Sequence, residues 1–325
     1  MSTPIRIGIV GYGNLGRGVE AALQFNPDLK LQAIFTRRQP ETVEADSKMV
    51  HISEVEKYKD QIDVMILCGG SATDLPEQGP QLAEMFHTVD SFDTHARIPE
   101  YFAQIDAAAQ KSGKVSVIST GWDPGLFSLN RLLMEAILPQ GTGQTFWGRG
   151  VSQGHSDAVR RVAGVKHAVQ YTIPQEEAIE SVRRGENPIL TTRDKHLRDC
   201  YVVPEEGADT ARIAEEIKSM PNYFADYETN VTFITEAELQ ANHAQMPHGG
   251  FVLRSGKSGG GHTHVMEFGI KLDNNPEFTS SVLVAYARAA YKLGADGQKG
   301  AKTVYDIPFG ALSPKSAADL RRELL

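Results

Sequence analysis

The first residues with a clear chemical use are three glycines near the start of the chain. Gly11, Gly13 and Gly16 have the spacing G-x-G-x-x-G, after an apolar stretch and before an amphipathic one. Here the first glycine allows a tight turn, the second lets a pyrophosphate approach the backbone, and the third lets helix and strand pack closely. A glycine turn without a ligand is the simpler alternative. The position of the glycine motif at the first strand–helix turn favours dinucleotide binding.

Two adjacent arginines, Arg37 and Arg38, follow Thr36 where the second apolar stretch ends. In many dinucleotide-binding domains an acidic residue at this place accepts a hydrogen bond from a free ribose 2′-hydroxyl. Guanidinium groups instead suit a 2′-phosphate, because they present planar donors and keep their charge. Two solvated surface charges are the alternative, but the position favours NADP over NAD.

Small residues follow the third apolar stretch at Cys68, Gly69, Gly70 and Ser71. Such residues let a cofactor lie close to the backbone, although the two glycines also suit a plain turn. No neighbour in the sequence is expected to lower the pKa of the Cys68 thiol, so we assign it no nucleophilic role.

Two carboxylates end the next two stretches: Asp93 in "SFDTH" and Asp123 in "STGWDPG". Ligands of such sheets bind outside the carboxyl ends of the strands, so Asp123 and Trp122 are expected beside a nicotinamide. Paired carboxylates accept hydrogen bonds from an ammonium group. Equally, Asp123 before Pro124 could form a turn and Asp93 could cap a helix. The pattern alone indicates an NADP oxidoreductase acting on a charged amino compound.

The histidines give no metal or triad signal. His262 and His264 point the same way on a strand but lack a third ligand, so no metal site is expected. His155, Ser156 and Asp157 are consecutive and cannot aim at one point.

Alternating strands and helices must position these residues. Strands are expected at 5–11, 31–37, 63–70, 87–93 and 114–120, with helices at 15–25 and 97–113. This alternation predicts an α/β fold with a parallel sheet, the Rossmann dinucleotide-binding domain, ending near residue 121.

The following part of the chain mixes strands and helices less regularly. Strands are expected at 167–174 and 230–235, a hairpin at 251–272, and helices at 176–185, 210–220 and 276–294. This order predicts an α+β domain with an antiparallel or mixed sheet.

Composition narrows the class of protein. A chain of 325 residues is typical of two domains, and a net charge of −8 argues against nucleic-acid binding. The two cysteines, Cys68 and Cys200, form no disulfide framework, which is typical of the cytoplasm. No apolar run has the length of a membrane span.

Several segments resemble the meso-diaminopimelate dehydrogenase family. The motifs "GYGNLGR", "GSATD", "STGWDPG", "TFWG", "SQGHSDA" and "PHGG" occur in the family's order over nearly the whole chain. The resemblance implies a dinucleotide-binding domain at 1–121, a substrate-binding and dimerisation domain at 122–299, and a C-terminal segment, 300–325, that packs back on the first. It further implies NADP-dependent, reversible oxidative deamination of the D-centre of meso-2,6-diaminopimelate to L-2-amino-6-oxopimelate and ammonia, on a route to lysine, by a cytoplasmic homodimer.

The resemblance also implies roles for individual residues. The implied cofactor contacts are Tyr12, Gly13, Asn14, Leu15, Thr36, Arg37, Arg38, Cys68, Gly69, Gly70, Ser71, Ser91, Phe92, Thr120, Gly121 and Pro124. Asp93, Asp123 and Trp122 would act at the reacting amino group. The rest of the substrate would meet Trp147, Gln153, Gly154, Asp157, Thr172, Arg198, His248 and Asn275.

Some alternatives stay open at this point. Asn275 before Pro276 also suits a helix N-cap, and Thr172 also suits the polar face of a strand. A broader NADP-dependent D-amino acid dehydrogenase would differ in the distal pocket, where Arg198 can pair bidentately with a carboxylate. A non-catalytic NADP-binding regulator would keep the Rossmann domain as a redox sensor.

Overall fold

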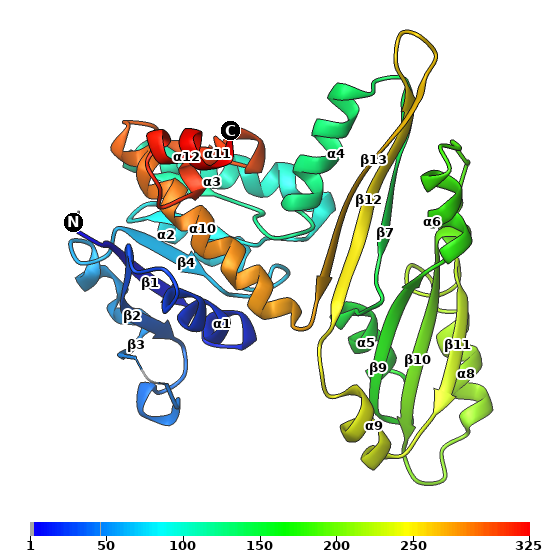
Figure 1. Ribbon diagram of the computed structural model, residues 1–325. Helices are drawn as coiled ribbons and strands as arrows, with labels where there is room; N and C mark the ends of the chain where they lie inside the picture. The colour runs from blue at the N-terminus through cyan, green and yellow to red at the C-terminus, as the bar shows by residue number, and fades with distance from the viewer. Residues whose placement is uncertain (1–2, 46) are drawn as a thin grey trace. The chain divides into compact units, whose positions relative to one another are not determined.

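The chain folds into two compact units in a computed structural model that describes residues 3–45 and 47–325 (Figure 1). The first unit runs to Leu129 and resumes at Pro276, and the second spans Asn130–Asn275. The expected domain boundaries at 121 and 299 stay a prediction beside this division by contacts. The first two residues of the expected domain at 1–121 lie outside the described part of the chain.

A parallel sheet forms the centre of the first unit. Among the described residues its strands follow the order β14-β6-β5-β4-β1-β2-β3. They are β1 (Ile5–Val10), β2 (Leu29–Thr36), β3 (Met49–His51), β4 (Val64–Leu67), β5 (His87–Asp90), β6 (Val115–Val117) and β14 (Gly300–Lys302). The predicted α/β fold with a parallel sheet is confirmed. The strands β3 and β14 were not predicted; each has three residues and lies at an edge of the sheet.

Helices cover both faces of this sheet. On one face Ile9 shares a core with Val19 of α1 and Leu283 of α10. On the other face Leu67 shares a core with Ile105 of α3. The helices with residues in this unit are α1 (Asn14–Leu23), α2 (Leu75–Ala83), α3 (Ile98–Ser112), α4 (Leu126–Ile137), α10 (Asn275–Ala295), α11 (Phe309–Leu312) and α12 (Ala317–Leu324). Short 3-10 helices lie at η1 (Pro40–Thr42), η2 (Ile52–Tyr58), η3 (His95–Arg97) and η4 (Val304–Asp306).

The helix α10 belongs mainly to the first unit, although the sequence pattern grouped it with the domain before it. A Cβ atom at Gly18 of α1 would lie 2.4 Å from Ser280 Oγ, so the two helices are in close contact. Arg288 is 2% exposed and donates to both carboxylate oxygens of Asp28, at 2.5 and 2.8 Å. These partners are distant in sequence, so a local pattern does not reveal them.

The second unit contains two sheets. Among the described residues one sheet has the order β11-β10-β9-β8 and is mixed, and the other has the order β13-β12-β7 and is antiparallel. The strands are β7 (Gly141–Trp147), β8 (Gly150–Val151), β9 (Val165–Pro174), β10 (His196–Pro204), β11 (Glu228–Phe233), β12 (His248–Lys257) and β13 (Thr263–Leu272). The helices are α5 (Gln153–Arg160), α6 (Glu176–Arg183), α7 (Thr192–Lys195), α8 (Thr210–Lys218) and α9 (Glu236–His243). The predicted α+β class and the long hairpin are confirmed (Figure 1).

Within the described ranges, no helix combines the length and the apolar character that crossing a membrane requires.

Candidate functional site

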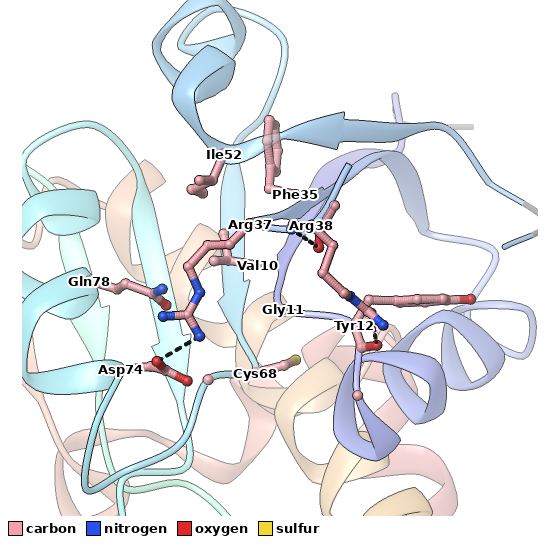
Figure 2. A pocket seen from close by; sticks show the side chains of 13 residues that line it. Val10, Gly11, Tyr12, Phe35, Arg37, Arg38, Ile52, Cys68, Asp74 and Gln78 are labelled. Atoms are coloured by element: carbon pink, nitrogen blue, oxygen red, sulfur yellow. Dashed lines mark hydrogen bonds and ion pairs between the residues drawn. The ribbon is translucent and has the colours of Figure 1, made fainter. Parts of the chain in front are cut away.

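A pocket of about 390 Å³ opens in the first unit at the carboxyl ends of β1, β2 and β4 (Figure 2). Its walls come from the turn after β1, the end of β2, the start of η2, the loop after β4 and the first turns of α2. The lining residues are Val10, Gly11, Tyr12, Gly13, Phe35, Thr36, Arg37, Arg38, Ile52, Cys68, Gly69, Asp74 and Gln78.

The three glycines shape the turn in different ways. Gly11 has φ +91°, a backbone conformation that residues with a Cβ atom rarely adopt. A Cβ atom at Gly16 would lie 2.1 Å from the carbonyl oxygen of Gly11, so only glycine fits there. Gly13 has φ −96° and no atom within 4 Å of a built Cβ, so neither backbone nor packing requires glycine. The space at Gly13 is therefore open to a ligand.

The helix α1 starts at this open space. Its N-cap, Gly13, supplies no capping side chain, and its first turn holds no acidic residue. The N-terminus of a helix attracts anions through its N–H groups and dipole. The turn thus fits the pyrophosphate of a dinucleotide.

The two arginines leave the end of β2 in different directions (Figure 2). Arg37 Nη2 lies 2.9 Å from Asp74 Oδ1 on the opposite wall. Arg38 Nη2 donates to the Tyr12 carbonyl at 3.0 Å, and the Arg38 backbone N–H donates to Thr36 Oγ1 at 3.1 Å. Two guanidinium groups beside a hydroxyl fit a phosphate, and the Asp74 carboxylate faces one of them, that of Arg37.

Sequence reasoning missed five side chains of this pocket: Val10, Phe35, Ile52, Asp74 and Gln78. Asp74 also accepts from the Gly70 N–H at 3.0 Å, which fixes the loop after β4. The chain offers no local signal for them, since their place depends on which strands are neighbours.

Other predicted cofactor residues lie at the same sheet edge but outside the pocket lining. Asn14 and Leu15 begin α1, while Gly70 and Ser71 follow β4. The remaining ones follow β5 and β6: Ser91, Phe92, Thr120, Gly121 and Pro124. Burial raises the pKa of the Cys68 thiol, which removes any basis for a nucleophile there.

The two proposed catalytic carboxylates lie on loops after the adjacent parallel strands β5 and β6. Asp93 is exposed, and its backbone N–H donates to Ser71 Oγ at 3.1 Å. Trp122, just before Asp123, is 8% exposed and packs edge-on against Phe127. Both loops lie on the first unit.

In the second unit, Thr172 and Arg198 pair across β9 and β10. Arg198 is 6% exposed, donates to the Thr172 hydroxyl, and lies 3.9 Å from the Tyr227 ring centroid. Its buried Nε makes no hydrogen bond. Burial lowers the pKa of Arg198, although the group stays a cation in proteins. A buried guanidinium with an unused donor fits a carboxylate ligand. Sequence reasoning missed the Tyr227 ring.

Two further predicted residues, His248 and Trp147, lie close to this pair where the two sheets of the second unit meet. Gly150 pairs with Thr172, and a Cβ atom at Gly150 would lie 2.4 Å from His248 Cγ. The Trp147 N–H donates to His196 Nε2 at 2.8 Å, and their rings stack. Burial lowers the pKa of His248 and lowers that of His196 to about 3, so both rings are neutral.

The remaining predicted substrate residues are Gln153, Gly154, Asp157 and Asn275. The first two begin α5, whose Asp157 forms an ion pair with Arg160. The Asn275 N–H donates to the Met246 carbonyl at 3.1 Å, near the start of β12. Across residues 3–45 and 47–325, no group of three or more potential metal ligands gathers.

The parallel sheet, the glycine turn and the pocket define a protein of the Rossmann dinucleotide-binding class. The diaminopimelic acid dehydrogenase C-terminal domain model matches residues 121–274. A meso-diaminopimelate D-dehydrogenase from Ureibacillus thermosphaericus is 68% identical over 323 residues, 99% of each chain. The chain therefore belongs to the meso-diaminopimelate D-dehydrogenase family.

Solved structures agree with this membership. A meso-diaminopimelate dehydrogenase variant from Clostridium tetani E88, solved with DAP, is 62% identical with a TM-score of 0.95 and covers 99% of this chain and 100% of that chain. An engineered D-amino acid dehydrogenase bound to NADP+ is 45% identical with a TM-score of 0.88, over 99% and 100% of the two chains.

Proposed function

We propose that the protein catalyses reversible, NADP-dependent oxidative deamination of the D-centre of meso-2,6-diaminopimelate to L-2-amino-6-oxopimelate and ammonia, a step of lysine biosynthesis. The similarity over 99% of the chain to a relative of that name, at 68% identity, carries this proposal. The relative bound to NADP+ supports the cofactor, and the relative solved with DAP supports the substrate.

The first unit binds the cofactor in this proposal. The N-terminus of α1 receives the pyrophosphate, and Thr36, Arg37 and Arg38 receive the 2′-phosphate. The other implied contacts continue along the same sheet edge. Bound NADP would supply the acceptor for the hydride of the substrate α-carbon.

Asp93 and Asp123 hold the reacting amino group. An ammonium presents three donors and a positive charge, which two carboxylates accept and orient. Trp122 is buried beside Asp123 and shapes that end of the site. Fixing the α-carbon in one orientation supplies a large part of the rate enhancement. The ammonium group loses a proton to solvent, which alkaline pH favours, and loss of the hydride from the α-carbon then leaves an iminium ion. Water converts this ion to the ketone and ammonium.

The distal amino acid end is held by the second unit. Arg198 binds its carboxylate, while Thr172, His248 and Asn275 contribute polar contacts. In this proposal the bound chain is lined by Trp147, Gln153, Gly154 and Asp157. A buried arginine that is left without its carboxylate penalises substrates that lack this end.

The direct test is NADPH absorbance with purified protein, meso-2,6-diaminopimelate and NADP at alkaline pH, with NAD and the LL isomer as controls. We expect reduction with the meso isomer and NADP only. Equal rates with D-alanine would instead establish the broader D-amino acid dehydrogenase. In the same assay Asp123→Asn should lose most of its turnover, because a neutral amide attracts the ammonium group less than a carboxylate does. Full turnover would remove Asp123 from catalysis.

We further propose a cytoplasmic homodimer. Exposed apolar side chains on the second unit, such as Leu133 and Ile137 at 49% and 55% exposure, support a protein contact there. Light scattering should give twice the mass of the chain, and a monomer at assay concentration would refute the dimer.

A further inference from the structure

A buried aspartate that the proposed mechanism does not use lies between the two catalytic loops. Asp90 ends β5 and is 1% exposed. Its Oδ1 accepts the N–H of Phe92 at 2.9 Å and the N–H of Ser119 at 3.0 Å. Its Oδ2 accepts the Tyr101 hydroxyl at 2.7 Å. One oxygen atom therefore joins the loop that carries Asp93 to the loop after β6.

The backbone of Asp90 makes the same connection. Its carbonyl accepts both the N–H of Thr120, at 2.9 Å, and the Thr120 hydroxyl, at 2.8 Å. The register between β5 and β6 ends at the pair Val89 and Val117. Beyond that pair, Asp90 supplies the contacts that hold the two loops together.

Ser119 shows why this contact matters for position. It has φ +56°, a left-handed conformation that is uncommon for residues other than glycine and needs support from its surroundings. The bond from its N–H to Asp90 supplies such support. Trp122 and Asp123 follow three and four residues later in the same loop. The backbone conformation of Ser119 therefore directs the course of the loop that carries them.

Tyr101 of α3 contacts the other carboxylate oxygen, Oδ2, which joins neither loop. Its ring stacks on Phe92 with centroids 4.1 Å apart, and a Cβ atom at Gly79 would lie 2.3 Å from its hydroxyl. Burial raises the pKa of Asp90 to about 6 while the three donors oppose that rise. At alkaline pH the group is thus a carboxylate held by hydrogen bonds.

We infer that Asp90 is a positioning residue for the reaction: its Oδ1 sets the relative placement of the loops that carry Asp93 and Asp123. The inference rests on the proposed function for the roles of those two carboxylates. Asp90 itself is buried and does not touch the substrate. Its hydrogen-bond acceptor, rather than its charge, carries the role.

Three variants separate these contributions. Asp90→Ala removes the acceptor for both amides, and misplacement of catalytic groups should lower kcat about 100-fold. Asp90→Asn keeps an oxygen for both amides and should restore kcat to within about threefold of wild type, because one acceptor oxygen suffices for both bonds. Tyr101→Phe removes only the bond to Oδ2 and serves as the matched control, with kcat near wild type. The Kd for NADPH should stay near wild type in Asp90→Asn and Tyr101→Phe. In Asp90→Ala it should rise by a smaller factor than kcat falls, because the two loops also carry the implied cofactor contacts Phe92 and Thr120.

Hydrogen exchange tests the geometry without substrate. The amides of Phe92 and Ser119 should be protected in wild type and Asp90→Asn, and should exchange faster in Asp90→Ala. Unprotected wild-type amides would overturn the inference even if Asp90→Ala does not fold. Wild-type kcat in Asp90→Ala, or an equal loss in Asp90→Asn, would also overturn it. If wild type does not oxidise meso-2,6-diaminopimelate, the proposed function fails. Protection of the Phe92 and Ser119 amides would still test the hydrogen bonds to Asp90.

Discussion

Replacing Arg38 by methionine should distinguish the two nicotinamide cofactors. One of the five N–H donors of Arg38 binds the Tyr12 carbonyl, at 3.0 Å. This bond holds the guanidinium group at the pocket, and the other donors can bind a phosphate. A hydrogen bond between charged groups contributes about 1.5–3 kcal/mol. The variant should therefore raise the Kd for NADPH about 10- to 150-fold. The Kd for NADH should change little.

Arg37 should matter less, although it carries the same charge. Its side chain is 68% exposed and already pairs with Asp74 at 2.9 Å. A bound phosphate would replace the Asp74 carboxylate as the anion beside Arg37. The net gain in binding free energy is then small, because exposed ion pairs contribute about 0–1 kcal/mol. Arg37→Met should raise the Kd for NADPH at most about fivefold.

Fluorescence titration with NADPH and NADH measures both effects. Arg17→Met is the matched control, because Arg17 lies over the Tyr12 ring and does not line the pocket. Equal losses for NADPH and NADH in Arg38→Met would refute the assignment of Arg38 to the 2′-phosphate. A larger rise in the Kd for NADPH in Arg37→Met than in Arg38→Met would refute the argument that pairing with Asp74 reduces the contribution of Arg37.

Two further predictions concern a substrate end and the fold. Arg198→Met, which also frees the Thr172 hydroxyl, should raise the KM for meso-2,6-diaminopimelate and reduce its preference over D-alanine; an unchanged substrate profile would remove Arg198 from the site. Arg288→Met leaves Asp28 and the Leu312 carbonyl without their partner and should lower the free energy of unfolding by about 3–5 kcal/mol in urea titrations. Arg288 lowers the pKa of Asp28. The stability from this ion pair is therefore fully present above the unfolded pKa of Asp28 and is lost as the pH falls through the folded pKa. An equal loss of unfolding free energy at acid and neutral pH would refute this prediction.

Local pattern was enough to predict the strands and the turn that form the nucleotide pocket. Gly11 and Gly16 are required by backbone angle and by contact distance, and such requirements leave a fixed spacing in the sequence. The arginines could be predicted because the end of the second strand has a known place in this fold. Each of these signals lies within a few residues of the feature that it indicates.

Contacts between distant segments could not be predicted in that way. Asp74 lies opposite Arg37 because β4 and β2 both neighbour β1, and strand order is not written in either segment. The helix α10 packs on α1 through Ser280 and Gly18, which are separated by most of the chain. The pattern shows that α10 is a helix but not which sheet it covers.

The stretch from Asp90 to Asp93 shows how burial assigns different roles to like residues. The expected strand ended at Asp93, whereas β5 ends at Asp90. Asp90 is 1% exposed and its oxygens are occupied by donors of the protein, whereas Asp93 is exposed. An ammonium group can reach only a carboxylate that is open to solvent, so binding falls to Asp93. Because Asp90 is enclosed, it can hold two loops in one arrangement, which an exposed carboxylate exchanging its partners with water could not do.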